Sequence, residues 1–239
     1  MRSPTHVLVP VAALQGESLS EPLVDLLSSV EVTLVGYHEL PDQTATDQAR
    51  RQYNHRLKRR LRSYADQFET AGRPVDTRTV FTHNARTTIE RIAIETEATA
   101  IVLPNPSPEM QQLLLPVRGE QNIDQLTSTT AEIVAQTDAE ITLFHAARSE
   151  SAQPLGQQLL ATAAELLHQA GVSDSRITTE TVVTRLPVAA IVETASDADC
   201  IVLGERNPSL VDRIFGEIPD RVARATNSPV IVVRKPLEK

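Results

Sequence analysis

Four short, mostly apolar segments occur twice in this chain, about a hundred residues apart and in the same order. The loops between them differ in length from one copy to the other. A repeat of this length is far longer than the ~20–50 residues of a solenoid unit, so each copy can hold a hydrophobic core of its own. The repeat therefore predicts two copies of one domain. The matching segments are 7–11 and 113–117, 32–35 and 141–144, 79–82 and 181–184, and 101–103 and 201–203.

The repeated segments are typical of strands that are buried on both faces of a parallel sheet, because their apolar residues are continuous rather than alternating. Helical patterns separate them, so we expect right-handed βαβ crossovers. The predicted strands are 6–11, 31–38, 75–82 and 99–104 in the first copy and 112–117, 139–146, 177–184 and 199–204 in the second. The longer predicted helices are 45–71, 121–136, 152–170 and 186–196. Only the second copy continues into a helix near 217–226 and a fifth strand at 229–233.

A proline-rich segment separates the two copies. Pro104, Pro106 and Pro108 can continue neither a central strand nor a helix, so this segment is predicted to be a linker. We place a truncated domain at residues 1–110 and a complete one at 111–239. The predicted fold is α/β, with two doubly wound parallel-sheet domains in tandem. The second has the strand order 3-2-1-4-5, and the first lacks the last helix and strand.

The charge balance argues against broad nucleic-acid binding, which depends on clustered lysine and arginine. The chain has a formal net charge of −8, with 31 acidic and 23 basic residues. Residues 50–62 are a local exception, because they contain seven basic residues and no acidic one. On a helix such a run is expected to form a solvated face, and a partner-binding surface is the alternative.

The remaining composition indicates a soluble cytosolic protein. No apolar run approaches the ~18 residues that a membrane span requires. The first residues lack the apolar core of a signal peptide. The single cysteine, Cys200, cannot form an internal disulfide, so nothing points to an oxidising compartment.

Four motifs follow one another along the second copy. The first two read Leu-Pro-Val-Arg-Gly-Glu at 115–120 and Ile-Thr-Leu-Phe-His-Ala at 141–146. The others read Asp-Cys-Ile-Val-Leu-Gly at 199–204 and Pro-Val-Ile-Val-Val-Arg at 229–234. In their order and spacing these motifs resemble the universal stress protein family. The resemblance covers about 112–235, and the first copy follows it more weakly over about 5–104.

The resemblance implies a five-stranded parallel sheet flanked by helices, of the adenine nucleotide alpha hydrolase type, paired as a dimer or as a tandem repeat. It also implies a role in stress tolerance and, in one branch of the family, binding of ATP or AMP. That branch carries G-x2-G-x9-G-S/T after its fourth strand, where glycines let backbone amides approach the phosphates. Here Gly204 begins the run, Asn207 replaces the second glycine, and Gly216 is followed by Glu217 instead of a hydroxyl residue.

These departures change the chemistry that the motif offers. Glu217 places a carboxylate at a helix start, where carboxylates contribute roughly 0.3–1 kcal/mol of stability. We interpret it as the helix's own anion, in the position that a phosphate needs. The family's acidic residue after the first strand is also replaced, by Arg118 in the second copy and by Ala12 in the first. ATP or AMP therefore stays an alternative ligand rather than an expected one.

Three arginines are expected near the carboxyl ends of the sheet strands, the edge at which open α/β sheets bind ligands. Arg118, Arg206 and Arg213 could form a small anion site there. Alternatively, Arg118 and Arg206 form surface ion pairs with neighbouring glutamates. The candidate ligand-binding residues are Arg118, Gly204, Arg206, Asn207, Gly216 and Glu217.

The sequence shows no catalytic or metal-binding pattern. The six histidines have no metal-ligand spacing, and no Ser/His/Asp order or paired carboxylate spacing is present. Cys200 lies in a predicted buried strand and is expected to fill the core. His38 and His145 occupy equivalent positions at the ends of the second strands, where packing is the main interpretation and contact with a ligand the alternative.

We therefore expect a regulatory or stress-response module without catalysis, acting through protein contacts or weak ligand sensing. One alternative is an ATP- or AMP-binding module or slow ATPase that uses the second domain. Another is an accessory module of a membrane transporter. The strand from Pro229 to Val233 would otherwise leave an apolar edge exposed, so we expect it to pair with its copy in a homodimer.

Overall fold

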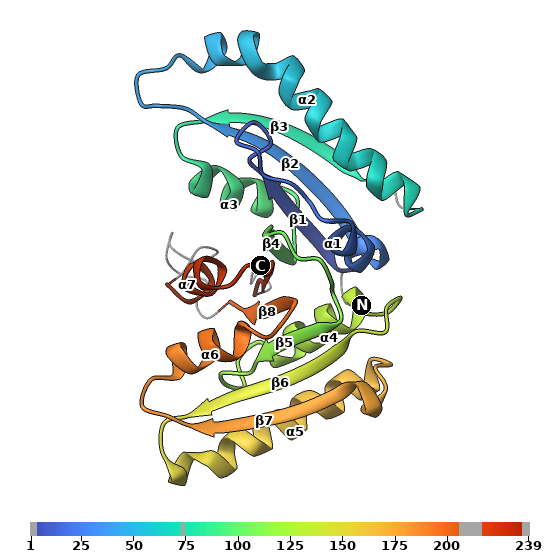
Figure 1. The fold of residues 1–239 in the computed structure, drawn as a ribbon, viewed down its shortest axis with the longest axis vertical. Coiled ribbons are helices and arrows are strands. Elements are labelled where there is room, and N and C mark those ends of the chain that lie inside the picture. The colour runs from blue at the N-terminus through green and yellow to red at the C-terminus, as the bar shows by residue number, and fades with distance from the viewer. Residues whose placement is uncertain (1–3, 73–74, 206–216, 236–239) are drawn as a thin grey trace.

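A single nine-stranded sheet runs through the molecule (Figure 1). The computed structural model describes residues 4–72, 75–205 and 217–235. The strand order is β3-β2-β1-β4-β9-β8-β5-β6-β7. The first half contains β1 (His6–Val11), β2 (Glu31–Glu39), β3 (Asp76–Thr82) and β4 (Ala100–Leu103). The second half contains β5 (Gln112–Pro116), β6 (Glu140–Ala147), β7 (Ile177–Val183), β8 (Cys200–Gly204) and β9 (Val230–Val233).

Helices cover both faces of the sheet, which confirms the doubly wound fold. The helices α1, α2, α4 and α5 pack on one face, and α3, α6 and α7 pack on the other. Short 3₁₀ turns, η1 (Leu27–Ser29), η2 (Glu150–Ala152) and η3 (Asp174–Arg176), accompany them. The helices are α1 (Glu21–Leu26), α2 (Thr46–Thr70), α3 (Ala85–Glu95), α4 (Ile123–Ile133), α5 (Gln153–Gln169), α6 (Pro187–Ala195) and α7 (Glu217–Ala225).

The first strand shows why the sequence reads as continuous apolar runs. Val7 and Val9 of β1 belong to the core under α1 and α2, whereas Leu8 between them packs against α3. All three are fully buried. Successive side chains of a strand point to opposite faces, so a strand covered on both sides has no polar position.

The predicted strand order of the second half is confirmed, because β7-β6-β5-β8-β9 corresponds to 3-2-1-4-5. The first half ends at β4 and, as predicted, has no helix or strand of its own after it before β5. Residues 104–111 contain neither helix nor strand, in agreement with the predicted linker. Because one sheet runs through both halves, the division into domains 1–110 and 111–239 stays a prediction.

The predicted homodimer through the strand Pro229–Val233 is wrong. β9 pairs in parallel with β8 and in antiparallel with β4, so both of its edges are already hydrogen-bonded within the chain. Ile231 lies between Val102 of the first half and Val202 of the second. The prediction failed because the truncation leaves β4 with an open apolar edge as well. The linker holds the two open edges close together, which favours pairing within the chain over association with another chain.

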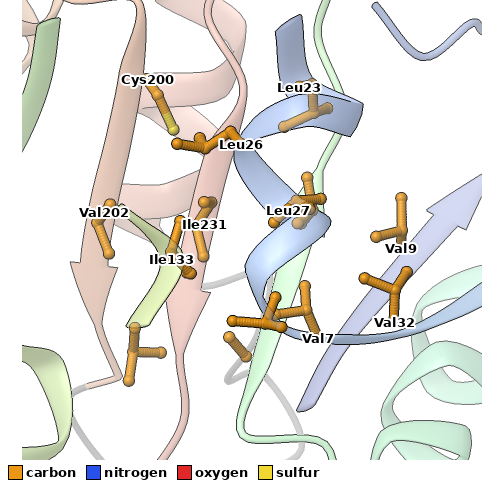
Figure 2. Close-up of a cluster of buried hydrophobic side chains, with 14 of the residues drawn as sticks. Val7, Val9, Leu23, Leu26, Leu27, Val32, Ile133, Cys200, Val202 and Ile231 are labelled. Atoms are coloured by element: carbon orange, nitrogen blue, oxygen red, sulfur yellow. The ribbon is translucent and has the colours of Figure 1, made fainter. Parts of the chain in front are cut away.

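The two halves also share a hydrophobic core on one face of the sheet. Figure 2 shows Leu26 of α1 beside Cys200 of β8, with Ile133 of α4 and Ile231 of β9 close by. These four side chains belong to one buried cluster that also contains Val7 and other first-half residues. The seam between the halves is therefore packed like the interior of either half.

On the other face, Arg234 crosses the seam from the end of β9. Its Nη1 donates to the carbonyl oxygens of Ala93, at 3.1 Å, and Ala98, at 3.0 Å, at the end of α3. Its backbone N–H donates to Thr99 O at 2.8 Å. Burial lowers the pKa of the Arg234 guanidinium, and the Glu205 and Glu90 carboxylates act in the opposite direction.

Leu26→Ala tests the shared core. Leu26 is 1% exposed, and removing a buried leucine side chain costs about 2–5 kcal/mol. We expect urea unfolding, followed by circular dichroism and tyrosine fluorescence, to shift as one transition for both halves. Leu155→Ala is the control, because Leu155 is 57% exposed and should change stability little. Two separate transitions, with only one displaced by Leu26→Ala, would contradict a shared core.

Cys200 reports opening of the same core. Burial, with a smaller contribution from Asp199, raises the pKa of the Cys200 thiol to about 12, and the side chain is fully buried. Because the thiolate is the reactive form, we expect an aromatic disulfide reagent at pH 8 to label Cys200 only as fast as the core opens. Leu26→Ala should accelerate labelling. Rapid labelling of the parent protein in buffer would show that the seam is not closed.

Candidate functional site

The best candidate site lies where the chain connections of the second half diverge. β5 and β8 are neighbours, but β5 leads towards β6 on one side and β8 towards β9 on the other. Such switch points leave a crevice outside the carboxyl ends of the strands. A cavity of about 430 Å³ lies there, and its lining residues are Pro116, Arg118, Gly119, Gln121, Leu126, Gly204 and Glu205.

Two of the predicted site residues meet in this cavity. Arg118 follows β5, Gly204 ends β8, and an Arg118 Nη2 hydrogen bond to the carbonyl oxygen of Gly204 joins the two loops. The Arg118 side chain is half-buried. The cavity therefore contains a positioned cation.

Glu205 is a site residue whose role was missed from the sequence, where it was considered only as a surface ion-pair partner. It is 9% exposed, and its Oε2 accepts a hydrogen bond from the backbone N–H of Lys235 at 3.0 Å. Its own N–H donates to Val233 O at 2.8 Å. Lys235 Nζ in turn donates to Gln121 Oε1 at 3.3 Å. The segment after β9 is therefore hydrogen-bonded to two residues that line the cavity.

The other predicted ligand residues are not placed with these two. Arg206, Asn207, Gly216 and Arg213 lie outside the described residues. Glu217 is the first residue of α7, as expected for a helix start, but its side chain lies outside the described part of the chain. The interpretation of Glu217 as an internal anion stays a prediction.

His145 holds the loop that carries Arg118. Its Nδ1 donates to the carbonyl oxygen of Val117 at 2.7 Å. The ring lies against Gly156 of α5, where an added Cβ would stand 2.3 Å from His145 Cδ2. An isolated glycine inside a predicted helix is the only sequence signal for this close approach. At the equivalent position, His38 instead packs beside Tyr53 and Phe81, with ring centroids 5.4 and 6.1 Å away.

The corresponding position in the first half is occupied by a carboxylate of the chain. Glu17 accepts a hydrogen bond through Oε2 from the backbone N–H of Ala12, directly after β1. Burial raises the pKa of Glu17, and the Ala12 hydrogen bond partly offsets this. Burial also raises the pKa of the nearby Tyr37 to about 12, with contributions from the Glu17 and Glu39 carboxylates. The cavity there is about 220 Å³, and its lining contains both the Glu17 carboxylate and the Arg224 guanidinium.

A double-mutant cycle tests how His145 and Gly156 fit together. Gly156→Ala is expected to lower the free energy of unfolding by about 1–3 kcal/mol, because the new methyl group overpacks the histidine ring. In a His145→Ala background the same change should be neutral or stabilise by up to ~1 kcal/mol, because alanine favours a helix over glycine. Urea unfolding of the four proteins measures both effects. An equal cost in the two backgrounds would show that the ring is not the obstacle.

Two further features of the described residues bear on function. No helix among them combines the length and the apolar composition that crossing a bilayer requires. Within the same residues, no three histidine, cysteine, aspartate or glutamate side chains gather in a way that could hold a metal ion.

Comparison with solved structures gives the same fold. A universal stress protein from Archaeoglobus fulgidus DSM 4304 is 14% identical, with a TM-score of 0.66 over 98% of this chain and 97% of that chain. The cytoplasmic domain of a prokaryotic cation chloride cotransporter is 12% identical, with a TM-score of 0.57 over 99% of this chain and 98% of that chain. At these identities the likeness shows the fold alone.

Comparison of sequences identifies the family. No curated protein matches the sequence. The family model described as the universal stress protein family matches residues 109–234, which is more than half of the chain. The chain therefore belongs to the universal stress protein family.

Proposed function

We propose that the chain is a regulatory module that binds a small anionic ligand at the β5–β8 switch point and does not transform it. The observation that carries this proposal is the Arg118 guanidinium in the wall of a cavity of about 430 Å³. That volume is within the ~300–1,000 Å³ of ordinary small-molecule pockets. A ligand with a phosphate or carboxylate group would find there a cation already positioned through Gly204 O.

The described lining residues support binding rather than chemistry. They include no serine, cysteine or histidine that could act as a nucleophile or base. The one carboxylate, on Glu205, accepts a hydrogen bond from the Lys235 backbone, which fixes it as part of the wall. A catalytic acid or base needs a neighbour that tunes it and a path to the reacting atom.

ATP or AMP is the alternative ligand, because doubly wound sheets bind nucleotides at such switch points. The proposal predicts that Arg118 contacts whichever anion binds. The third prediction, an accessory role for a membrane transporter, rests on family resemblance and would be tested by co-purification of the chain with membranes.

A thermal-shift panel with ATP, ADP, AMP, inorganic phosphate and citrate tests the proposal. A ligand at ~100 times its dissociation constant should stabilise the fold by ~2.7 kcal/mol. Arg118→Ala should weaken its binding roughly 10- to 100-fold, because a charge-assisted hydrogen bond is lost. Arg148→Ala is the matched control, since Arg148 is exposed after β6. If Arg118→Ala binds every stabilising anion as tightly as the parent protein does, Arg118 is not part of the binding site.

A turnover assay separates binding from catalysis. Incubation with each stabilising nucleotide should return it unchanged. Release of ADP or phosphate that disappears in Arg118→Ala but persists in Arg148→Ala would contradict the non-catalytic part of the proposal.

A further inference from the structure

One helix of the first half carries a concentrated positive charge. Seven lysine and arginine residues occur from Arg50 to Arg62 of α2, both ends included, and no acidic residue occurs from 48 to 65. All seven side chains are exposed, and we call them the basic face of α2. The chain as a whole has a formal net charge of −8, so the remaining residues carry −15. The molecule is therefore strongly polarised.

The second half shows that the fold does not require this charge. The helix α5 (Gln153–Gln169) occupies the same place in the repeat as α2, after the second strand and before the third. It contains no lysine or arginine. Both helices bury an apolar face against the sheet, so packing does not explain the difference.

Contacts within the chain do not explain the concentrated positive charge of α2 either. Arg62 forms ion pairs with Asp66, at 2.7 Å, and Glu69, at 3.0 Å, and Arg60 lies over the ring of Tyr64. Among the described residues, no ion pair is recorded for the other five members of the basic face. Like charges four residues apart, such as Arg56 with Arg60, destabilise a helix. A helix with this repulsion and few partners is arranged to meet an external anion.

The shape of the basic face favours a flat anionic surface. α2 has 25 residues, which corresponds to ~37 Å of helix, and it forms the outer layer at one end of the molecule (Figure 1). The basic residues occupy the stretch from Arg50 to Arg62, ~18 Å of that helix, and a plane of lipid headgroups can meet several of them at once. Base readout and single-strand binding of nucleic acids also use donors that enter a groove or stacking aromatic side chains. The aromatic residues of α2 are instead turned inward: Tyr64 and Phe68 are buried and Tyr53 is half-buried.

We propose that the basic face of α2 docks on an anionic lipid bilayer surface. None of the exposed large apolar side chains of the described residues lies on α2, so the contact is electrostatic and no side chain inserts. Clusters of four to eight lysine and arginine residues bind anionic headgroups in this way. The acidic remainder of the molecule is repelled by the same surface, which orients α2 towards it.

Vesicle sedimentation tests this proposal. We expect the full chain to sediment with vesicles of phosphatidylcholine and phosphatidylglycerol in equal parts, but not with phosphatidylcholine alone. Binding should disappear at ~1 M salt, where the Debye length falls to ~3 Å. Failure to sediment with the mixed vesicles at low salt would overturn the proposal.

Matched charge removals locate the surface. Arg51→Gln with Lys58→Gln should weaken vesicle binding roughly 30-fold, from the contribution expected of each cation. Arg148→Gln with Arg185→Gln removes the same charge from exposed positions of the second half and should leave binding unchanged. Equal weakening by both pairs would indicate a net-charge effect and contradict docking through α2. Salt-sensitive binding to duplex DNA that depends on Arg51 and Lys58, without vesicle binding, would assign the face to nucleic acid instead.

Discussion

The pairing of β9 with strands on both of its edges is the contact on which the rest of the structure depends. The first half stops after β4 and the second half ends in β9, so each would expose an unpaired apolar strand. Their antiparallel pairing satisfies both sets of backbone groups within one chain. It also aligns the two sheets closely enough for Leu26 and Cys200 to share a core. Because the first half lacks a last strand of its own, β4 is free to pair with β9, and the two halves form one sheet.

The same seam reaches the candidate site. The residues directly after β9 divide their contacts, because Arg234 binds carbonyl groups at the end of α3 whereas the backbone of Lys235 holds Glu205 in the cavity wall. Glu205 also acts on the pKa of Arg234. The residues after β9 therefore connect a wall residue of the second-half cavity with the contact that joins the halves.

Much of the fold could be predicted from the sequence, because burial on both faces leaves a continuous apolar run for each strand. Contacts between segments that lie far apart in the sequence could not be predicted. Nothing in the pattern of Pro229–Val233 distinguishes an intermolecular partner from β4, since both offer an apolar edge. In the site, Arg118 was predicted because it follows a strand that ends at this sheet edge, and Gly204 because it begins the run that resembles the family's glycine motif. Glu17 was not, because it belongs to a loop and its position depends on how that loop folds back to Ala12.

The two halves share one fold but differ at two equivalent positions of the repeat. At the end of the first strand, the first half places the carboxylate of Glu17 and the second half the guanidinium of Arg118. After the second strand, the first half carries the basic face of α2, whereas α5 of the second half has no lysine or arginine. Each difference appears against an otherwise repeated framework, so neither is a requirement of folding. We therefore propose ligand binding for the second half and surface docking for the first, and substitutions outside the shared core should separate the two.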